Sequence, residues 1–188
     1  MRLSTKSVAF SIILIALGLA LSPFYIVVGP TKPLPWQHMI NVIAAIFLGP
    51  WYAIFIAFVI SLIRNMTGTG TLFAFPGAIP GALVVGCVYY FIRKTDYAAL
   101  TEPIGTAIGA LLSALIVSGG FLTPVPSFWG IQAQWILLLI AFLVSSIPGS
   151  ILGFILVKAL RRAGFTEIIS PKEASPKGAS RKESSRNG

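Results

Sequence analysis

Residues 38–63 read HMINVIAAIFLGPWYAIFIAFVISLI, an apolar run without Lys, Arg, Asp or Glu. A helix crosses a hydrocarbon core of about 30 Å with about 20 apolar residues, so the run is long enough for a membrane span. It can form one long tilted helix, or two short helices that turn at Gly49-Pro50, where Pro50 lacks a backbone donor and Gly49 permits the turn. The choice decides how many times the chain crosses the membrane.

The rest of the composition is also that of a membrane protein. Of the 188 residues, 56% are hydrophobic and only 10% are charged, and the mean hydropathy is +0.88. A water-exposed surface cannot be built from this composition. The sequence therefore predicts an all-α integral membrane protein, with further apolar segments at about 7–28, 72–92, 103–131 and 132–157.

The basic residues decide between five and six spans, because positive charge accumulates in short cytoplasmic loops. With a turn at Gly49-Pro50, seven basic residues near span ends fall inside and only Lys32 and Arg64 fall outside. Without the turn, Arg93, Lys94 and the whole basic C-terminus move outside. We therefore expect a compact bundle of about six transmembrane helices, with both termini in the cytoplasm and three outward loops at 29–35, 65–76 and 120–132.

The formal charge of +9 is explained by this topology rather than by nucleic-acid binding, which we do not expect. After Gly164 the chain becomes polar and basic, and such a tail cannot bury enough apolar surface to offset its ordering entropy. We expect two parts, a transmembrane substrate-binding domain over residues 1–165 and a disordered cytoplasmic tail over residues 166–188.

Polar and aromatic residues gather on the outward side. Rings, amides and one imidazole suit a small, flat heteroaromatic ligand bound by stacking and hydrogen bonds. His38 and Asn41 lie about one turn inside the second span, where polar side chains need partners, although His38 can also be structural. The tryptophans also suit an interfacial belt, and Arg64 can snorkel to the headgroups. The candidate ligand-binding residues are Trp36, Gln37, His38, Asn41, Arg64, Asn65, Thr69, Trp129, Gln132 and Gln134.

Small residues mark helix-packing faces, since they let helix backbones approach closely in lipid. Pairs of glycines four residues apart occur in the last three spans, at 77 and 81, 105 and 109, and 149 and 153. They predict one tight bundle. Ala9, Ala16 and Ala20 share one face of the first span, which serves either internal packing or docking of another membrane protein.

Several kinds of chemistry have no signature in the sequence. There is no phosphate-binding Gly-x4-Gly-Lys-Ser/Thr loop and no His/Cys cluster, so we expect no metal, no cofactor and no ATP hydrolysis by this chain. No Asp or Glu lies inside an expected span apart from Glu102 at an inner edge, whereas ion-coupled carriers usually need an intramembrane carboxylate. An intramembrane enzyme would need a nucleophile beside His38, and the surrounding motif contains none.

Two stretches carry a family resemblance, GPTKPLPWQH at 29–38 and GTGTLFAFPG at 68–77. With them, the size, the six short spans and the alanine face make residues 1 to about 165 resemble the S components of energy-coupling-factor (ECF) vitamin transporters. Within these, the chain looks like the ThiW group, which is linked to uptake of thiamine precursors.

The resemblance implies a substrate-capture subunit in a prokaryotic cell membrane. Such a subunit takes its substrate from outside and hands it to a transmembrane T component and two cytosolic ATPase subunits. The implied substrate is hydroxyethylthiazole. This thiazole is neutral and offers Lys32 and Arg64 no obvious partner, so an anionic relative stays open. An S component for another vitamin-like solute and a membrane scaffold subunit are the remaining alternatives.

Overall fold

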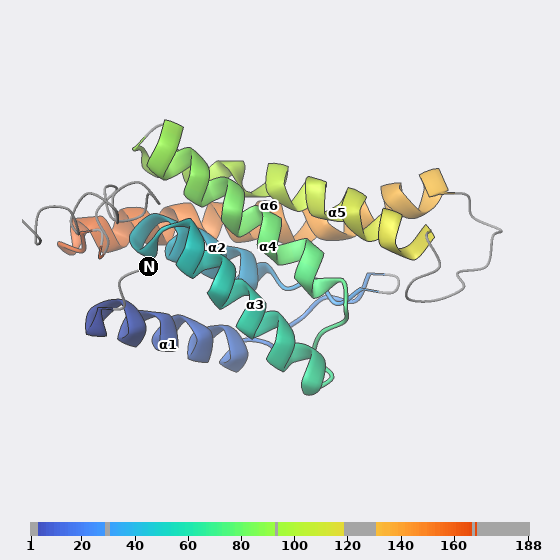
Figure 1. Cartoon of the computed structure of the whole chain (residues 1–188), viewed down its shortest axis with the longest axis horizontal. Helices are drawn as coiled ribbons and strands as arrows, with labels where there is room; N and C mark the ends of the chain where they lie inside the picture. Colours follow the sequence, from blue (N-terminus) through green and yellow to red (C-terminus); the bar gives the residue numbers. More distant parts are fainter. Residues whose placement is uncertain (1–3, 29–30, 93, 119–130, 167, 169–188) are drawn as a thin grey trace, which may run out of the picture.

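The computed structural model describes residues 4–28, 31–92, 94–118, 131–166 and 168, with side chains for all of these except 116–118 and 131–134. These residues form a helical bundle without a β-strand (Figure 1), which confirms the predicted all-α membrane fold. The α-helices are α1 (Thr5–Ala20), α2 (Pro35–Leu48), α3 (Pro50–Met66), α4 (Ala74–Cys87), α5 (Glu102–Ser118) and α6 (Ile131–Arg162), with a π-helical turn η1 (Val88–Ile92) and a 3₁₀ helix η2 (Asp96–Thr101).

The helix α2 forms the centre of the bundle. Every side chain from Gln37 to Leu48 is buried, because α3, α4 and α6 pack around α2 and α1 adds a further contact. A helix that is apolar on all sides needs such an enclosed position. The polar residues near the start of α2 are therefore also held inside the protein.

A break at Gly49 separates α2 from α3, as predicted. Gly49 has a φ of 88°, a conformation that glycine adopts without the steric cost of a Cβ. Pro50 then opens α3 at a position where its missing N–H is not needed. Residues 38–63 thus form parts of two helices and not one.

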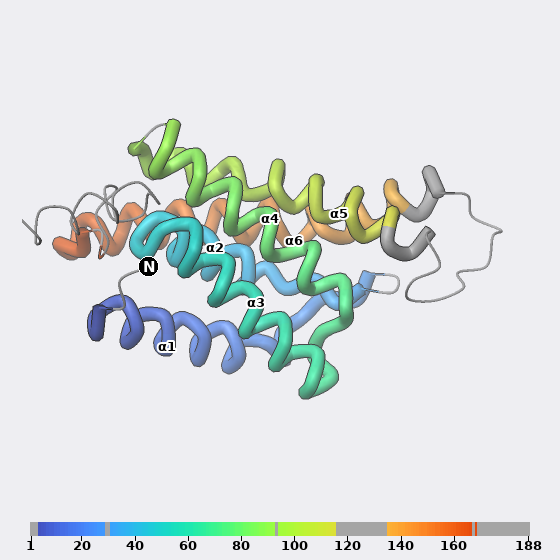
Figure 2. The backbone as a smooth tube through the Cα atoms, viewed as in Figure 1, coloured from blue at the N-terminus to red at the C-terminus, as the bar shows by residue number. Residues whose placement is uncertain are grey.

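The first helix is shorter than its apolar run suggests, since α1 ends at Ala20 and not near Val28. Residues 21–28 and 31–34, which we call the strap, leave α1 and return to α2 (Figure 2). The strap is joined by a hydrogen bond of 3.0 Å from Ile26 N to Pro33 O. Pro23 has no backbone donor, which explains why the helix does not continue.

The glycine pairs of α5 and α6 do bring helices close together. A Cβ at Gly105 or Gly109 would collide with backbone carbonyl oxygens of α4, and one at Gly149 would collide with the carbonyl oxygen of Pro35 at the start of α2. At Gly153 an added Cβ would come within 2.8 Å of the Val42 Cβ. The predicted tight packing of the last three helices is confirmed, and it also includes α2.

The outer faces of the bundle are apolar. Three helical segments in the described residues are long and apolar enough to cross a membrane, Ala74–Ile92, Asp96–Leu115 and Trp135–Arg162, whereas α1, α2 and α3 are shorter apolar helices. Large apolar side chains such as Ile12, Phe55 and Ile155 are exposed. This surface suits contact with lipid chains.

Candidate functional site

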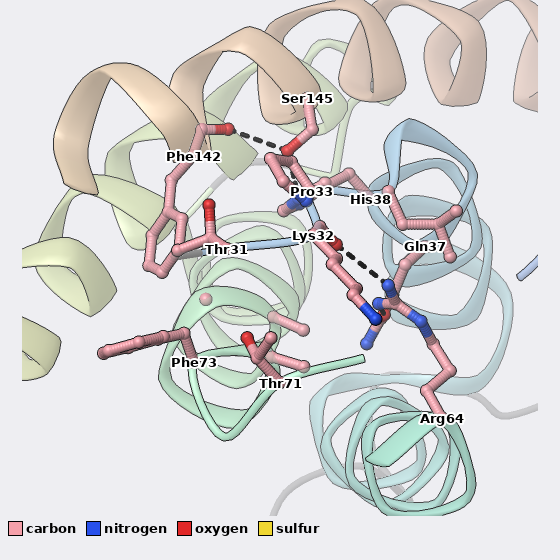
Figure 3. A pocket seen from close by; sticks show the side chains of 14 residues that line it. Thr31, Lys32, Pro33, Gln37, His38, Arg64, Thr71, Phe73, Phe142 and Ser145 are labelled. Carbon is pink, nitrogen blue, oxygen red and sulfur yellow. Dashed lines mark hydrogen bonds between the residues drawn. The ribbon is translucent and has the colours of Figure 1, made fainter. Parts of the chain in front are cut away.

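A small pocket lies inside the bundle, where the strap meets the first turns of α2 and α4 (Figure 3). Its cavity volume is about 30 Å³, which is room for about one or two water molecules. The polar groups on its wall come from the strap, α2, α3 and α6, and Phe73 and Phe142 add aromatic rings. The pocket is therefore small and partly open to solvent, and an organic ligand fits into it only if the surrounding segments move.

One polar network on the pocket wall is centred on Arg64, whose side chain is only 2% exposed. Its Nη1 donates to Gln37 Oε1 at 2.5 Å. Its Nη2 donates to the carbonyl oxygens of Lys32 at 2.9 Å and Thr69 at 3.1 Å. Arg64 thus ties α3 to α2, to the strap and to the turn that follows α3, while its Nε has no partner. The alternative interpretation of Arg64, snorkelling to the headgroups, does not describe this buried side chain.

A second polar network is centred on His38 and Glu102. The His38 Nδ1 lies 2.6 Å from Glu102 Oε1, and Glu102 also accepts hydrogen bonds from Thr106 at 3.1 Å and from Ser146. On the other side of the ring, the His38 Nε2 lies 3.1 Å from Ser145 Oγ. If Glu102 is ionised it can only accept, so the Nδ1–H must then be the donor. Glu102 therefore fixes the imidazole, and with it the atom that faces the pocket.

The position of Glu102 corrects one interpretation of the sequence. Glu102 is 0% exposed and lies inside the apolar helical segment Asp96–Leu115, so it is not at an edge of the membrane-spanning part. The 3₁₀ helix η2 continues directly into α5 and lengthens that segment before Glu102. The protein therefore does contain a buried carboxylate within a helical segment that is apolar enough to cross a membrane, and His38 is its partner.

Ser145, His38 and Glu102 are connected in the order of a Ser-His-acid triad. Such a triad also needs donors that stabilise an oxyanion beside the serine. The Ser145 Oγ donates to the carbonyl oxygen of Phe142 at 3.0 Å, and Ser145 lies in the interior of α6, where helix hydrogen bonds occupy the backbone amides. The arrangement holds the imidazole in place, and the Phe142 carbonyl oxygen competes with His38 for the single hydroxyl proton of Ser145.

The other candidate residues are divided between the pocket wall and its surroundings. Gln37, His38 and Arg64 line the pocket. Asn41 is fully buried behind them; its Nδ2 donates to the carbonyl oxygen of Ala78 at 3.0 Å and its Oδ1 has no partner. Asn65, Thr69 and Trp36 are half-buried. Asn65 donates hydrogen bonds to the carbonyl oxygens of Ser61 and Thr71. The carbonyl oxygen of Thr69 accepts a hydrogen bond from Arg64, and Trp36 packs on the central core. Trp129 and the side chains of Gln132 and Gln134 lie outside the described residues.

Comparison with known proteins identifies the family of the chain. A family model described as thiamine-precursor transporter protein (ThiW) matches residues 8–163. The chain belongs to the ThiW family. Neither the curated proteins nor the solved structures that were compared contain a match to it. Membership in the ThiW family gives the protein a role in transport, and the matched residues include both polar networks.

Several wall residues of this ThiW-family protein were not among the candidates. Phe73, Phe142 and Ser145 line the pocket, and Glu102 and Ser146 support it from behind. A sequence signal existed for the polar ones, because a lone acidic residue and a Ser-Ser pair in apolar runs need partners in a membrane. The sequence did not indicate which helix would supply those partners.

The alanine face of α1 in this ThiW-family protein points away from the bundle. Ala9, Ala16 and Ala20 are exposed, whereas the opposite face, with Ser7, Ser11, Leu14 and Gly18, is buried. Internal packing of α1 therefore uses Gly18 and not the alanines.

Proposed function

We propose that this protein is the substrate-capture subunit of an ATP-driven ECF importer and that it binds hydroxyethylthiazole at the outer face of a prokaryotic cell membrane. The observation that carries the proposal is the small pocket of a ThiW-family chain, in which Gln37, His38 and Arg64 line the same wall as two aromatic rings. A flat heteroaromatic ring stacks well against aromatic side chains, and a few placed polar groups fix its orientation.

Binding requires the pocket to open, because about 30 Å³ is too small for a substituted thiazole ring. Hydrogen bonds to backbone carbonyl groups hold the strap and the turn after α3, and these contacts can be exchanged for contacts with a ligand. The turn after α3 and residues 31–34 of the strap belong to the loops that the charge distribution predicts to lie outside the cell. Capture from outside therefore needs movement of loops and no movement of α2.

Delivery of the substrate needs partners, because the sequence contains no ATP-binding loop. We propose that the exposed face of Ala9, Ala16 and Ala20 docks against the T component, which two cytosolic ATPase subunits drive. A row of small side chains lets another helix approach closely in lipid. In this arrangement both termini and the tail after residue 165 are cytoplasmic.

The test is ligand binding by the purified protein in detergent, without ATP or partners. Thermal-shift and calorimetric titrations would compare thiamine, its pyrimidine precursor, hydroxyethylthiazole and the phosphate ester of hydroxyethylthiazole. We expect binding of a thiazole compound and none of the pyrimidine. Binding of a different solute would make the protein a capture subunit for that solute, and binding of none would favour a scaffold role.

A further inference from the structure

The charges around the pocket are not balanced. Arg64 is 2% exposed, and all its hydrogen-bond partners are neutral oxygen atoms, from the Gln37 amide and two backbone carbonyl groups. Its Nε–H is buried and has no partner at all. A buried guanidinium normally pairs with an anion, because removing its charge from water is costly.

A second cation lies on the same wall. Lys32 lines the pocket together with Arg64 (Figure 3). Its Nζ donates to the carbonyl oxygen of Gly68 at 2.5 Å and lies 5.1 Å from the centre of the Tyr25 ring. Neither contact supplies a negative charge, so two fixed positive charges face one small volume.

In the part of the chain that the structure describes, no acidic residue is left to neutralise them. It contains five Asp and Glu residues. Asp96 pairs with Arg161 at 2.6 Å, and Glu102 pairs with His38. The other three, Glu167, Glu173 and Glu183, follow α6 in the sequence. No Asp or Glu occurs in the strap, in the turn after α3 or anywhere in residues 103–166.

We propose that the substrate carries its own negative charge, and that the transported form is a phosphate monoester of the thiazole, bound by Lys32 and Arg64. This inference rests on the proposed function and specifies the substrate class of the same site. A neutral alcohol would leave both cations without a counter-charge, whereas a phosphate forms short charge-assisted hydrogen bonds with them.

The same donors that would bind the phosphate now hold the turn after α3 against the pocket. Lys32 donates to Gly68 and Arg64 donates to Thr69, both in the turn after α3. A phosphate oxygen competes directly with these two carbonyl oxygens, since charged acceptors bind cationic donors more strongly than neutral ones. Binding of the anion therefore releases the turn and enlarges the pocket, which a neutral ligand does less readily.

The experiment is calorimetry on the full chain in phosphate-free, lipid-free detergent with hydroxyethylthiazole, its phosphate ester and inorganic phosphate. We expect the ester to bind at least about tenfold more tightly than the alcohol, and to lose affinity as salt rises. Lys32→Gln should weaken binding of the ester by about fivefold or more, and should weaken binding of the alcohol much less. Lys6→Gln removes the same charge from an exposed position on α1 and should change neither.

Arg64 also supports the fold, so the variant for this position is Arg64→Lys. This substitution keeps the positive charge and removes the planar guanidinium with its several donors. It should weaken ester binding while the protein still unfolds cooperatively. Equal affinity for alcohol and ester would overturn the inference and leave the proposed function standing, whereas failure of both thiazole compounds to bind would defeat the proposed function itself. If phosphatidylglycerol shifts the melting temperature through Lys32 and the ester does not, the anion is a lipid headgroup and the substrate assignment is wrong.

Discussion

His38 and Glu102 stabilise the interior only as a pair. The carboxylate of Glu102 is fully buried, and His38 is the one ionisable side chain that contacts it in the described part of the chain. Removal of one member of such a pair leaves a buried group without its partner, which typically costs about 3–5 kcal/mol, whereas apolar replacement of both members is often neutral. The pair therefore allows structural and ligand-binding roles to be separated.

We predict that His38→Ala destabilises the protein by about 3–5 kcal/mol and weakens ligand binding, because Glu102 loses its partner and the pocket loses its imidazole. The double variant His38→Leu/Glu102→Met should regain most of the stability but not the binding. Unfolding in detergent and calorimetric titration measure the two properties. Normal ligand affinity in the double variant would show that the pair is structural only.

The helix α1 shows how one element can serve two contacts. Its buried face is polar and small, with Ser11 donating to the Ser7 carbonyl oxygen at 2.8 Å and Gly18 packed so closely that a Cβ would lie 2.6 Å from Ile60 Cδ1. Its other face carries the alanines, which are exposed. A bulky residue on that outer face should not disturb the bundle.

For this reason we predict that Ala16→Trp reduces transport strongly in vesicles that contain the partner subunits, while the purified subunit binds its ligand normally. The matched control is Ile155→Trp, at an exposed position on α6, which should leave transport unchanged. Equal loss of transport in both variants would point to a general effect of surface bulk. Loss of ligand binding in Ala16→Trp would instead place the alanine face in the fold.

At the scale of the whole molecule, ionic groups are concentrated at opposite ends. One end holds the Asp96–Arg161 ion pair, with Tyr89 as a further acceptor for Arg161. The other end holds the Arg64 network and Lys32. The apolar lengths of α4, α5 and α6 lie between them (Figure 1). Charges at both ends of an apolar middle are what a bilayer requires of a spanning protein.

The two ends can be assigned to sides of the membrane with cysteine labelling. In a Cys87→Ala background we expect Met66→Cys, at a residue that is 78% exposed, to react with a membrane-impermeant reagent applied to intact cells. Gly188→Cys should react only after the cells are opened, since basic loops stay in the cytoplasm. The reverse pattern would invert the topology and place the pocket on the cytoplasmic side.

The sequence alone determined those features that depend on neighbouring residues. The apolar runs require helices in lipid because each backbone polar group must be satisfied within its own segment. Gly49-Pro50 had to interrupt residues 38–63 because a proline cannot donate and a glycine can take a positive φ. Gln37, His38 and Arg64 were identifiable as candidates because polar side chains in apolar surroundings need partners. These three residues of the pocket wall could therefore be predicted, together with the fold class.

Only the tertiary structure decided which partners these residues have. His38 meets Glu102 and Ser145, which are 64 and 107 positions away in the sequence, and Arg64 meets Gln37 across 27 positions. These contacts depend on how closely α5 and α6 approach α4 and α2. The glycine motifs showed that close approach was possible but did not indicate which helices would meet, because a residue without a side chain can accept any neighbour. Similarly, Glu102 lies within a long apolar segment only because η2 continues directly into α5. The position of a residue relative to a membrane depends on the whole segment that contains it.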